Sequence, residues 1–335
     1  MAKRETALDL LRLLALLGVI FTHAGGITTD STRTKYILAF LMAAVTWHVP
    51  VFVMISGRFF LDPSREVTAV KLRKAIIRLV IAFLFWNVVY QIYNILSGFY
   101  VGLNWKGILS EAMQGPYHLW FLFMMACLYA ITPFLRKIAE DRNLTEYFIV
   151  LFLIFEFLTM YGPSLPLIGA TVELLMNKTQ FHFALGFSGY YLLGYYLHRY
   201  PLTGKKEMGL YLLGIAMFLF TGFATVWNVC RGVEGNEWFS KYLMPNVAIE
   251  AAALYTFFVN RISRIPFSER CTGWISRLAE YSFGMYLVHT LIIPLSGMLP
   301  WNRIPLVIHI LFIFASSAVV TALIRKIPRI GKKIT

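Results

Sequence analysis

Three ionisable side chains, Asp9, Arg12 and His23, interrupt an otherwise apolar segment over residues 7–26. A charged group near the centre of a bilayer costs at least ~2.5–3.5 kcal/mol on insertion scales, so each is a candidate functional residue. Arg12 and His23 are eleven residues apart. At ~100° per residue this separation returns to nearly the same helix face, about 16 Å further along. One face therefore presents a guanidinium and an imidazole, groups suited to anion binding and proton transfer.

A structural interpretation competes with this one. In it, Arg12 lies near the cytoplasmic end of the segment and extends its charge toward the headgroups, and His23 lies at the outer interface. Arg12 can also form an ion pair with Asp9 at i, i+3, or with Glu5 further down the helix. The spacing alone leaves both interpretations open.

The composition predicts a membrane protein. Hydrophobic residues make up 58% of the 335 residues and charged residues 14%, and the mean hydropathy is +0.65, which is too apolar for a soluble domain. The net charge of +14 does not indicate a nucleic-acid partner, because Lys and Arg lie in alternate short loops between apolar segments. The three cysteines have no metal-ligand spacing, so we expect no disulfide and no metal site.

The predicted fold is an all-α polytopic membrane protein with about ten transmembrane helices, forming a single membrane domain over residues 1–335. Helices are expected because open strands cannot satisfy their backbone hydrogen bonds in lipid. The first segment imitates a signal peptide, but it is long and interrupted by charges, so we expect it to be retained. The predicted spans cover residues 7–26, 36–60, 75–97, 117–135, 146–162, 181–198, 208–227, 241–260, 278–297 and 304–325.

The basic residues predict the orientation. They concentrate in the loops after the second, fourth, sixth and eighth spans and in the C-terminal tail, whereas the opposite loops are poor in Lys and Arg. The positive-inside rule then puts both termini in the cytoplasm. In this topology Arg12 lies in the cytoplasmic half of the first helix and His23 near its outer end.

Four motifs, in this order along the chain, resemble the acyltransferase-3 family of integral membrane acyltransferases. They are Arg12 and His23 with ten residues between them, His48-Val-Pro-Val-Phe-Val-Met-Ile-Ser-Gly57, Tyr117-His-Leu-Trp-Phe-Leu122, and Ser282-Phe-Gly-Met-Tyr-Leu-Val-His289. The tight spacing of the second and fourth motifs resembles the branch that O-acetylates surface-polysaccharide precursors.

The resemblance implies transfer of an acyl group, usually acetyl, from cytoplasmic acyl-CoA to a hydroxyl of an envelope sugar, with His23 as the essential catalytic residue. A neutral imidazole can accept the proton of a sugar hydroxyl that attacks the thioester. It can instead accept the acyl group and pass it on, and both roles stay open. Arg12 can hold the pantetheine arm or a phosphate, or stabilise the oxyanion.

A basic donor site on the cytoplasmic side is also implied. Arg73, Lys74 and Arg78 are candidates, because clustered Arg and Lys bind phosphate. The family commonly has a further arginine three residues before the position of Arg78; that position is Ala75 here, and Lys74 can substitute as a point charge. Positive-inside charge alone is the competing explanation.

Further candidates lie in the second and fourth spans. Arg58, low in the second span, faces either the donor channel or lipid headgroups, and Ser56 either bonds to the donor or serves close helix packing. His118 and Trp120, at the outer mouth of the fourth span, are candidates for the acceptor site; the alternative is an interfacial aromatic anchor.

Isolated intramembrane acids should have partners. Glu156 and Glu250 are such acids, and either can orient His23 through its second ring nitrogen. Tyr286 and His289 in the ninth span are possible site residues, with an interhelical hydrogen bond as the alternative, and Asp9 is a further possible one.

The expected protein is a membrane O-acyltransferase in the bilayer of a bacterial plasma or inner membrane. Acetyl-CoA or another acyl-CoA is its co-substrate, an extracytoplasmic glycan or lipid-linked sugar is its acceptor, and no metal is needed. The main alternative is a transporter of a small polar molecule or amino acid on the same fold, which would not require the Arg12–His23 face beside a basic mouth. A third is an inactive assembly or flippase-like partner, which the presence of the motif residues disfavours and the missing arginine at Ala75 leaves open.

Overall fold

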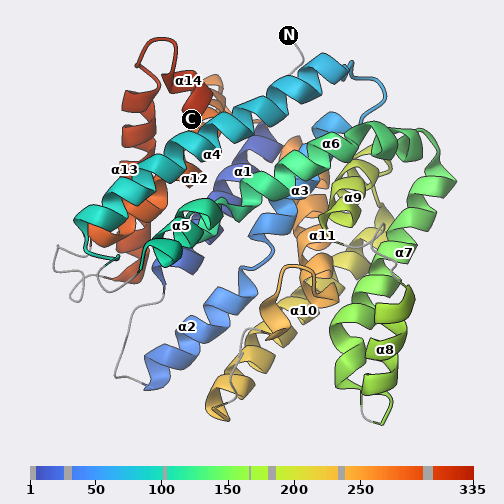
Figure 1. Cartoon of the computed structure of the whole chain (residues 1–335). Coiled ribbons are helices and arrows are strands. Elements are labelled where there is room, and N and C mark those ends of the chain that lie inside the picture. The colour runs from blue at the N-terminus through green and yellow to red at the C-terminus, as the bar shows by residue number, and fades with distance from the viewer. Residues whose placement is uncertain are drawn as a thin grey trace. The chain divides into compact units, whose positions relative to one another are not determined.

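Every regular element in the described part of the chain is a helix (Figure 1). The computed structural model describes residues 5–25, 32–100, 104–165, 167–179, 186–232, 238–296 and 305–335. The prediction of an all-α protein is therefore confirmed.

Eight described segments are long and apolar enough to cross a membrane, so the chain is a polytopic membrane protein. These segments are α1 (Thr6–Ala24), Thr32–Phe60 with α2 (Thr32–Ala44) and α3 (His48–Phe60), α4 (Ala69–Leu96), Trp105–Glu140 with α5 (Trp105–Gln114) and α6 (Trp120–Glu140), α7 (Arg142–Tyr161), α10 (Gly204–Cys230), α12 (Glu269–Ser296) and α13 (Leu306–Ile324).

The sixth and eighth predicted spans correspond to shorter helices. They are α9 (Phe187–Arg199), with 13 residues, and α11 (Pro245–Asn260), with 16 residues. Neither reaches the roughly 20 residues that a straight helix needs to cross the hydrocarbon core. Both are largely buried inside the protein, as expected for helices that other helices surround. The remaining α-helices are α8 (Gly169–Thr179) and α14 (Gly331–Ile334).

The chain divides into two compact units, whose boundaries fall between α3 and α4, within α6 and within α12. Unit 1 consists of Met1–Glu66 and Thr132–Ala279, and unit 2 of Val67–Ile131 and Glu280–Thr335. The first two motifs belong to unit 1, and the third and fourth belong to unit 2.

The second predicted span is broken in its middle. Residues 45–47 form a turn between α2 and α3. Pro50 explains the break, because proline has no N–H for the carbonyl of Thr46 and its ring crowds that carbonyl. Thr46 donates its hydroxyl to the carbonyl of Ala43 at 2.6 Å. The predicted span over residues 36–60 therefore lies within one candidate span, Thr32–Phe60, that contains two helices, and His48 begins the second of them.

Glycines allow the closest helix packing in unit 1, between α3 and α9 (Figure 1). A Cβ on Gly57 would lie 1.8 Å from the carbonyl oxygen of Tyr191, and one on Gly194 would lie 2.2 Å from that of Met54. Only a residue without a side chain fits at such approaches. The Ser-Gly pair that ends the second motif thus includes a packing residue, as the sequence suggests.

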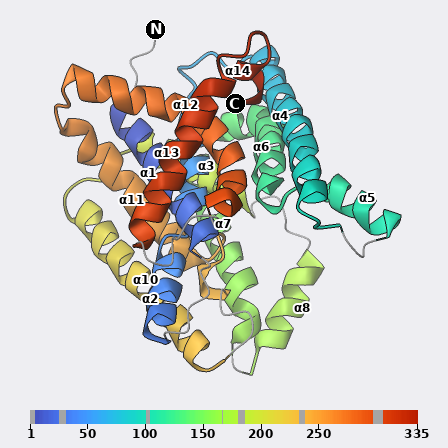
Figure 2. The same ribbon diagram turned by 90° about the vertical axis from the view of Figure 1, so that its left-hand side faces the viewer.

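In unit 2, the short helix α14 packs against α4 (Figure 2). The indole nitrogen of Trp86 donates to the carbonyl of Ile334 at 2.8 Å, and the Ile334 and Thr335 side chains are buried. Gly284, in the fourth motif, leaves room for Thr321 and Thr335, because a Cβ there would lie 2.4 Å and 2.8 Å from their side chains. The tail after α13 is therefore an integral part of this unit.

Candidate functional site

His23 lies next to a second histidine in unit 1. It is half-buried near the end of α1, whereas His48 is only 1% exposed at the start of α3. The two imidazoles are close enough to interact electrostatically. His48 Nε2 lies 3.1 Å from the hydroxyl of Thr22, and its ring contacts that of Tyr242 edge-on at 5.6 Å. A partly accessible imidazole beside a buried one is an arrangement that can exchange a proton.

Arg12 forms the local ion pair that the structural interpretation predicts. Its guanidinium lies 3.5 Å from the Asp9 carboxylate, to which Ser276 also donates at 3.4 Å. Asp9 is buried and the Arg12 side chain is 27% exposed. The pair orients Arg12 on α1.

The two intramembrane acids have polar partners within unit 1. Glu156 accepts a hydrogen bond from the backbone N–H of Gly186. Glu250 accepts one from the hydroxyl of Thr221, which in turn accepts from Asn246 at 2.7 Å. These bonds connect each acid to groups other than His23, and the orienting role stays a prediction.

Arg58 is held by two carboxylates. Its guanidinium lies 2.5 Å from Asp62 and 3.1 Å from Glu5. Arg65 adds weaker contacts to the same acids at 3.6 Å and 3.5 Å. Burial alone would raise the pKa of the Asp62 carboxyl, but hydrogen bonds from Ser64 and Arg58 outweigh burial and lower the pKa to about 2. This cluster joins the start of α1 to the end of α3.

Ser56 bonds within its own helix, since its hydroxyl donates to the carbonyl of Phe52 at 3.0 Å. Such a bond to the i−4 carbonyl satisfies a hydroxyl in an apolar helix. The hydroxyl oxygen retains acceptor capacity, and its role in donor binding stays a prediction.

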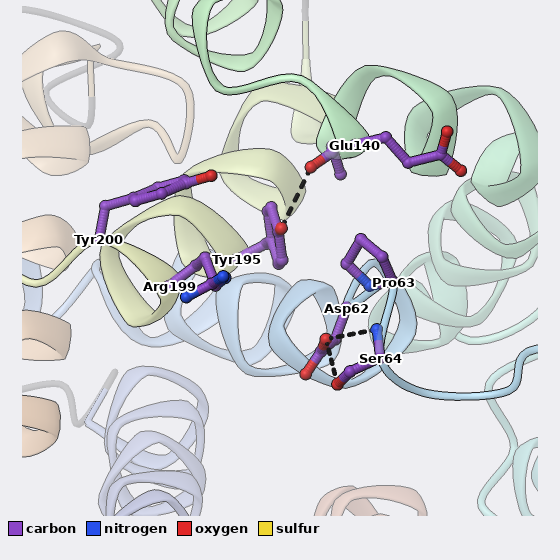
Figure 3. A pocket seen from close by; sticks show the side chains of 8 residues that line it. Asp62, Pro63, Ser64, Glu140, Tyr195, Arg199 and Tyr200 are labelled. Carbon is purple, nitrogen blue, oxygen red and sulfur yellow. Dashed lines mark hydrogen bonds between the residues drawn. The ribbon is translucent and has the colours of Figure 1, made fainter.

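Two cavities open beside this cluster. One has a volume of about 460 Å³ and is lined by residues that include Asp62, Glu140, Tyr195 and Arg199 (Figure 3). Tyr195 in its wall donates to the carbonyl of Ala139 at 3.1 Å.

The other cavity has a volume of about 1000 Å³, and its lining includes Glu5, His198, Asn260 and Arg264. Both cavities are lined by residues of loops that the predicted topology puts on the cytoplasmic side of the membrane. This orientation stays a prediction.

The third and fourth motifs meet in unit 2. His118 is 2% exposed and His289 is 0% exposed, and their rings contact at 5.6 Å. Tyr286 donates its hydroxyl to the backbone carbonyl of His118. Thr290 lies 3.3 Å from His118 Nε2, and Tyr90 of α4 bonds to Thr290 and stacks edge-on against His118 at 5.0 Å.

This second cluster contains three of the predicted residues, His118, Tyr286 and His289, while Trp120 lies apart from it. Trp120 is 38% exposed at the start of α6. The buried His118 is contacted from α4 and α12 and has little surface for an acceptor. The exposed Trp120 offers a ring face, which is the surface that sugar rings bind. Both acceptor assignments stay predictions.

The predicted donor-binding residues of α4 are exposed near its start. Arg73, Lys74 and Arg78 all belong to this group. Arg78 has the most defined position, because it donates to the carbonyl of Thr335 at 2.7 Å and lies 5.1 Å from the ring of Phe283.

Sequence reasoning missed several residues. Tyr90 and Thr290 complete the cluster around His118. The sequence carries a signal for Tyr90, because a buried tyrosine hydroxyl needs a hydrogen-bond partner. Pro50 in the second motif was a signal for the helix break before it.

Comparison with known families identifies one match. The acyltransferase-3 model, described as an acyltransferase domain, matches residues 5–326 and so covers nearly the whole chain. Comparisons with curated proteins and with solved structures gave no significant match.

Proposed function

Because the chain belongs to the acyltransferase-3 family, we propose that it is an O-acyltransferase that moves an acetyl group from cytoplasmic acyl-CoA to a hydroxyl of a cell-envelope polysaccharide or its lipid-linked precursor. The family match over residues 5–326 supports acyl transfer in general. The donor, the acetyl group and the acceptor are those that the resemblance of the motifs to the surface-polysaccharide branch implies. Residues 1–335 act as one acyltransferase domain in a bacterial plasma or inner membrane.

The position of His23 carries the mechanistic part of the proposal. Its half-buried imidazole lies beside a buried histidine and is reachable, as a reacting group must be. As a base, it accepts the proton of the sugar hydroxyl while the oxygen attacks the thioester carbonyl. The C–S bond then breaks, and the proton returns to the departing CoA thiolate. Arg12, oriented by Asp9, lies about 16 Å along the helix from His23 and holds the pantetheine arm or a phosphate of the donor.

As an acyl carrier, His23 attacks the thioester itself. An acyl-imidazole then forms as CoA leaves, and the sugar hydroxyl takes the acyl group in a second step. Brief incubation of purified protein with radiolabelled acetyl-CoA in the absence of acceptor separates the two mechanisms. Label retained on wild-type protein and absent from the His23→Gln variant indicates the carrier, and no retained label indicates the base.

The first prediction is that His23→Ala abolishes acetyl transfer, by at least about 100-fold, because general acid–base catalysis contributes about 10²–10⁴-fold. The measurement is acetyl transfer to isolated envelope glycan in membranes with matched expression. His309→Gln is the control, since it removes another buried histidine, whose Nε2 lies 2.7 Å from the Ser296 hydroxyl, and it should retain activity. Wild-type transfer by His23→Ala would exclude the mechanism, and a wild-type protein that neither binds nor hydrolyses acetyl-CoA would exclude the function.

A further inference from the structure

The short helix α5 of unit 2 has an apolar face and a polar face. At ~100° per residue, its apolar residues fall within about 140° of the helix circumference. These residues are Trp105, Ile108, Leu109, Ala112 and Met113. The remaining circumference carries Lys106, Ser110, Glu111 and Gln114. A helix with this pattern is amphipathic, and its apolar face requires an apolar environment.

The apolar face of α5 is exposed in the structure. Trp105 is 69% exposed, Leu109 50% and Met113 72%, and none of the residues of α5, all of which the structure describes, is buried. α4 contacts the C-terminal end of the helix. There, Asn87 donates to the carbonyl of Ala112 at 2.7 Å. This contact holds the end of α5 and leaves its apolar face uncovered.

α5 lies between two helices that are long enough to cross the membrane. α4 has 28 residues and α6 has 21, and both reach the about 20 residues that a crossing needs. α5 is not a continuation of α6, because residues 115 and 116 are not helical and Gly115 has a φ of 71°. Figure 2 shows α5 beside the end of α4 and turned away from its axis. Since α4 ends at the membrane surface where α6 begins, α5 lies at that surface.

An exposed apolar face of α4 leads toward α5. Leu84, Val88, Ile92 and Ile95 are spaced three or four residues apart and so share one face of the helix, and each of them is more than half exposed. In a membrane-crossing helix such a face contacts lipid chains, which are as apolar as leucine. Lipid that covers this face up to the end of α4 at Leu96 therefore also reaches α5.

We propose that α5 is a membrane-surface helix that binds the headgroup region of the leaflet in which α4 ends. Trp105, Leu109 and Met113 insert among the lipids, and the polar face contacts water. The predicted topology makes this the outer leaflet. The occupant is the bilayer and not a protein, because the helices on both sides of α5 along the chain lie in that bilayer. The inference does not depend on the proposed function.

The residue types of α5 suit this position. Trp105 begins the helix, and tryptophan is enriched at the membrane–water interface. Lys106 lies 5.8 Å from the Trp105 ring, and its charge is opposite to that of Glu111 on the same polar side. Apolar area and not net charge therefore provides the affinity, and the apolar face of such a helix lies about 5–10 Å into the interface.

The direct test compares two neighbouring positions on different faces of α5. Leu109→Cys and Ser110→Cys are made separately in the full-length chain, with the native cysteines changed to Ser, and each is labelled with a bimane fluorophore. The protein is placed in phosphatidylcholine nanodiscs that hold one copy each, so that a second copy cannot cover α5. Lipids brominated on their acyl chains quench from the membrane, and iodide quenches from water.

The expected result is opposite quenching at the two positions. Brominated lipid should quench the fluorophore at residue 109 more than the one at residue 110, and iodide should quench in the reverse order. Quenching of both by iodide alone would show that α5 stands in water and would overturn the proposal. Quenching of both by brominated lipid alone would place the whole helix inside the membrane, and protection of both from the two quenchers would show a protein cover; either result would also overturn it.

A second measurement uses the wild-type chain and needs no variant to fold. Phosphatidylcholine with a photoactivated diazirine in its acyl chain is added to the same nanodiscs, and the labelled residues are identified by mass spectrometry. Trp105 and Met113 should carry label, whereas Lys106 and Gln114 should not. Val88 of α4 is the internal control, because it faces lipid within a membrane-crossing helix. Labelling of Val88 without any label on α5 would contradict the proposal.

Discussion

Three arginines with proposed roles in binding the donor differ in what neutralises their charge. Arg12 pairs with Asp9, and Arg58 pairs with two carboxylates. Arg78 donates to a backbone carbonyl and stacks on a ring. A guanidinium already held by two carboxylate side chains gains less from a phosphate than one that contacts no acidic side chain among the described residues. Arg78 is therefore better suited than Arg58 to bind the donor, and Arg58 is better suited to hold α1 and α3 together.

The carboxyl of Asp62 should make the stability of the protein depend on acid pH. Its pKa is about 2 in the folded protein and 3.8 ordinarily, so the unfolded chain binds the proton more readily. The stabilisation is then complete above about pH 4 and is lost as the pH falls toward about 2. We expect the thermal unfolding midpoint of detergent-purified protein to fall in this window. The Asp62→Asn variant should unfold at a lower temperature than the wild type at neutral pH. Its unfolding temperature should also fall less when the pH is lowered.

Glu140 provides a control for this pH dependence, because it lines the same cavity as Asp62. Glu140 is exposed and contacts Lys137, and surface pairs of this kind contribute little to stability. Glu140→Gln should therefore retain the wild-type pH profile. A profile of Asp62→Asn that parallels the wild type between pH 4 and 2 would show that other groups cause the acid sensitivity.

At the scale of helices, the sequence predicts elements better than it predicts partners. Hydropathy located the long helices, because burying about 20 apolar residues in lipid dominates their free energy. Hydropathy did not reveal the break before His48, because Pro50 acts through one missing N–H that a hydropathy average does not detect. The motif around His118 does not indicate that Tyr90 and Thr290 contact this histidine. Their meeting depends on how α4, α6 and α12 pack, and side-chain pairs across helices have no local pattern.

The glycine contact between α3 and α9 should be sensitive to a single methyl group. Gly57→Ala puts a Cβ 1.8 Å from the carbonyl oxygen of Tyr191, so the helix backbones must move apart. We expect a loss of about 3 kcal/mol, at the upper end for overpacking. The measurements are a lower thermal unfolding midpoint and a smaller monodisperse fraction in detergent.

Gly209 is the matched control, because it is also helical but has no neighbouring atom within 4 Å of a Cβ. Gly209→Ala should be neutral or stabilising by up to about 1 kcal/mol, since alanine is the better helix former. Equal stability of the two alanine variants would show that the α3–α9 contact tolerates separation.

For the molecule as a whole, charge is distributed unevenly between the two units. Of the 17 acids in the chain, only Glu111 and Glu280 belong to unit 2. Unit 1 instead neutralises many of its cations internally, as the cluster of Glu5, Arg58 and Asp62 shows. The positive-inside rule counts every Lys and Arg in a loop, whether or not an acidic side chain neutralises it. Sequence alone therefore predicts the orientation but cannot separate cations that set topology from cations that bind a ligand.

The native cysteines test that orientation without any added residue. Cys127, Cys230 and Cys271 are free and exposed; the predicted topology puts Cys230 outside, Cys271 in the cytoplasm and Cys127 within the fourth span. Variants that keep one cysteine each, with the others changed to Ser, should react differently with a membrane-impermeant maleimide. Cys230 should be labelled in intact cells, Cys271 only after permeabilisation, and Cys127 in neither case, because thiolates form poorly in lipid. Labelling of Cys271 but not Cys230 in intact cells would invert the topology and put the start of α4, with Arg78, on the outer side.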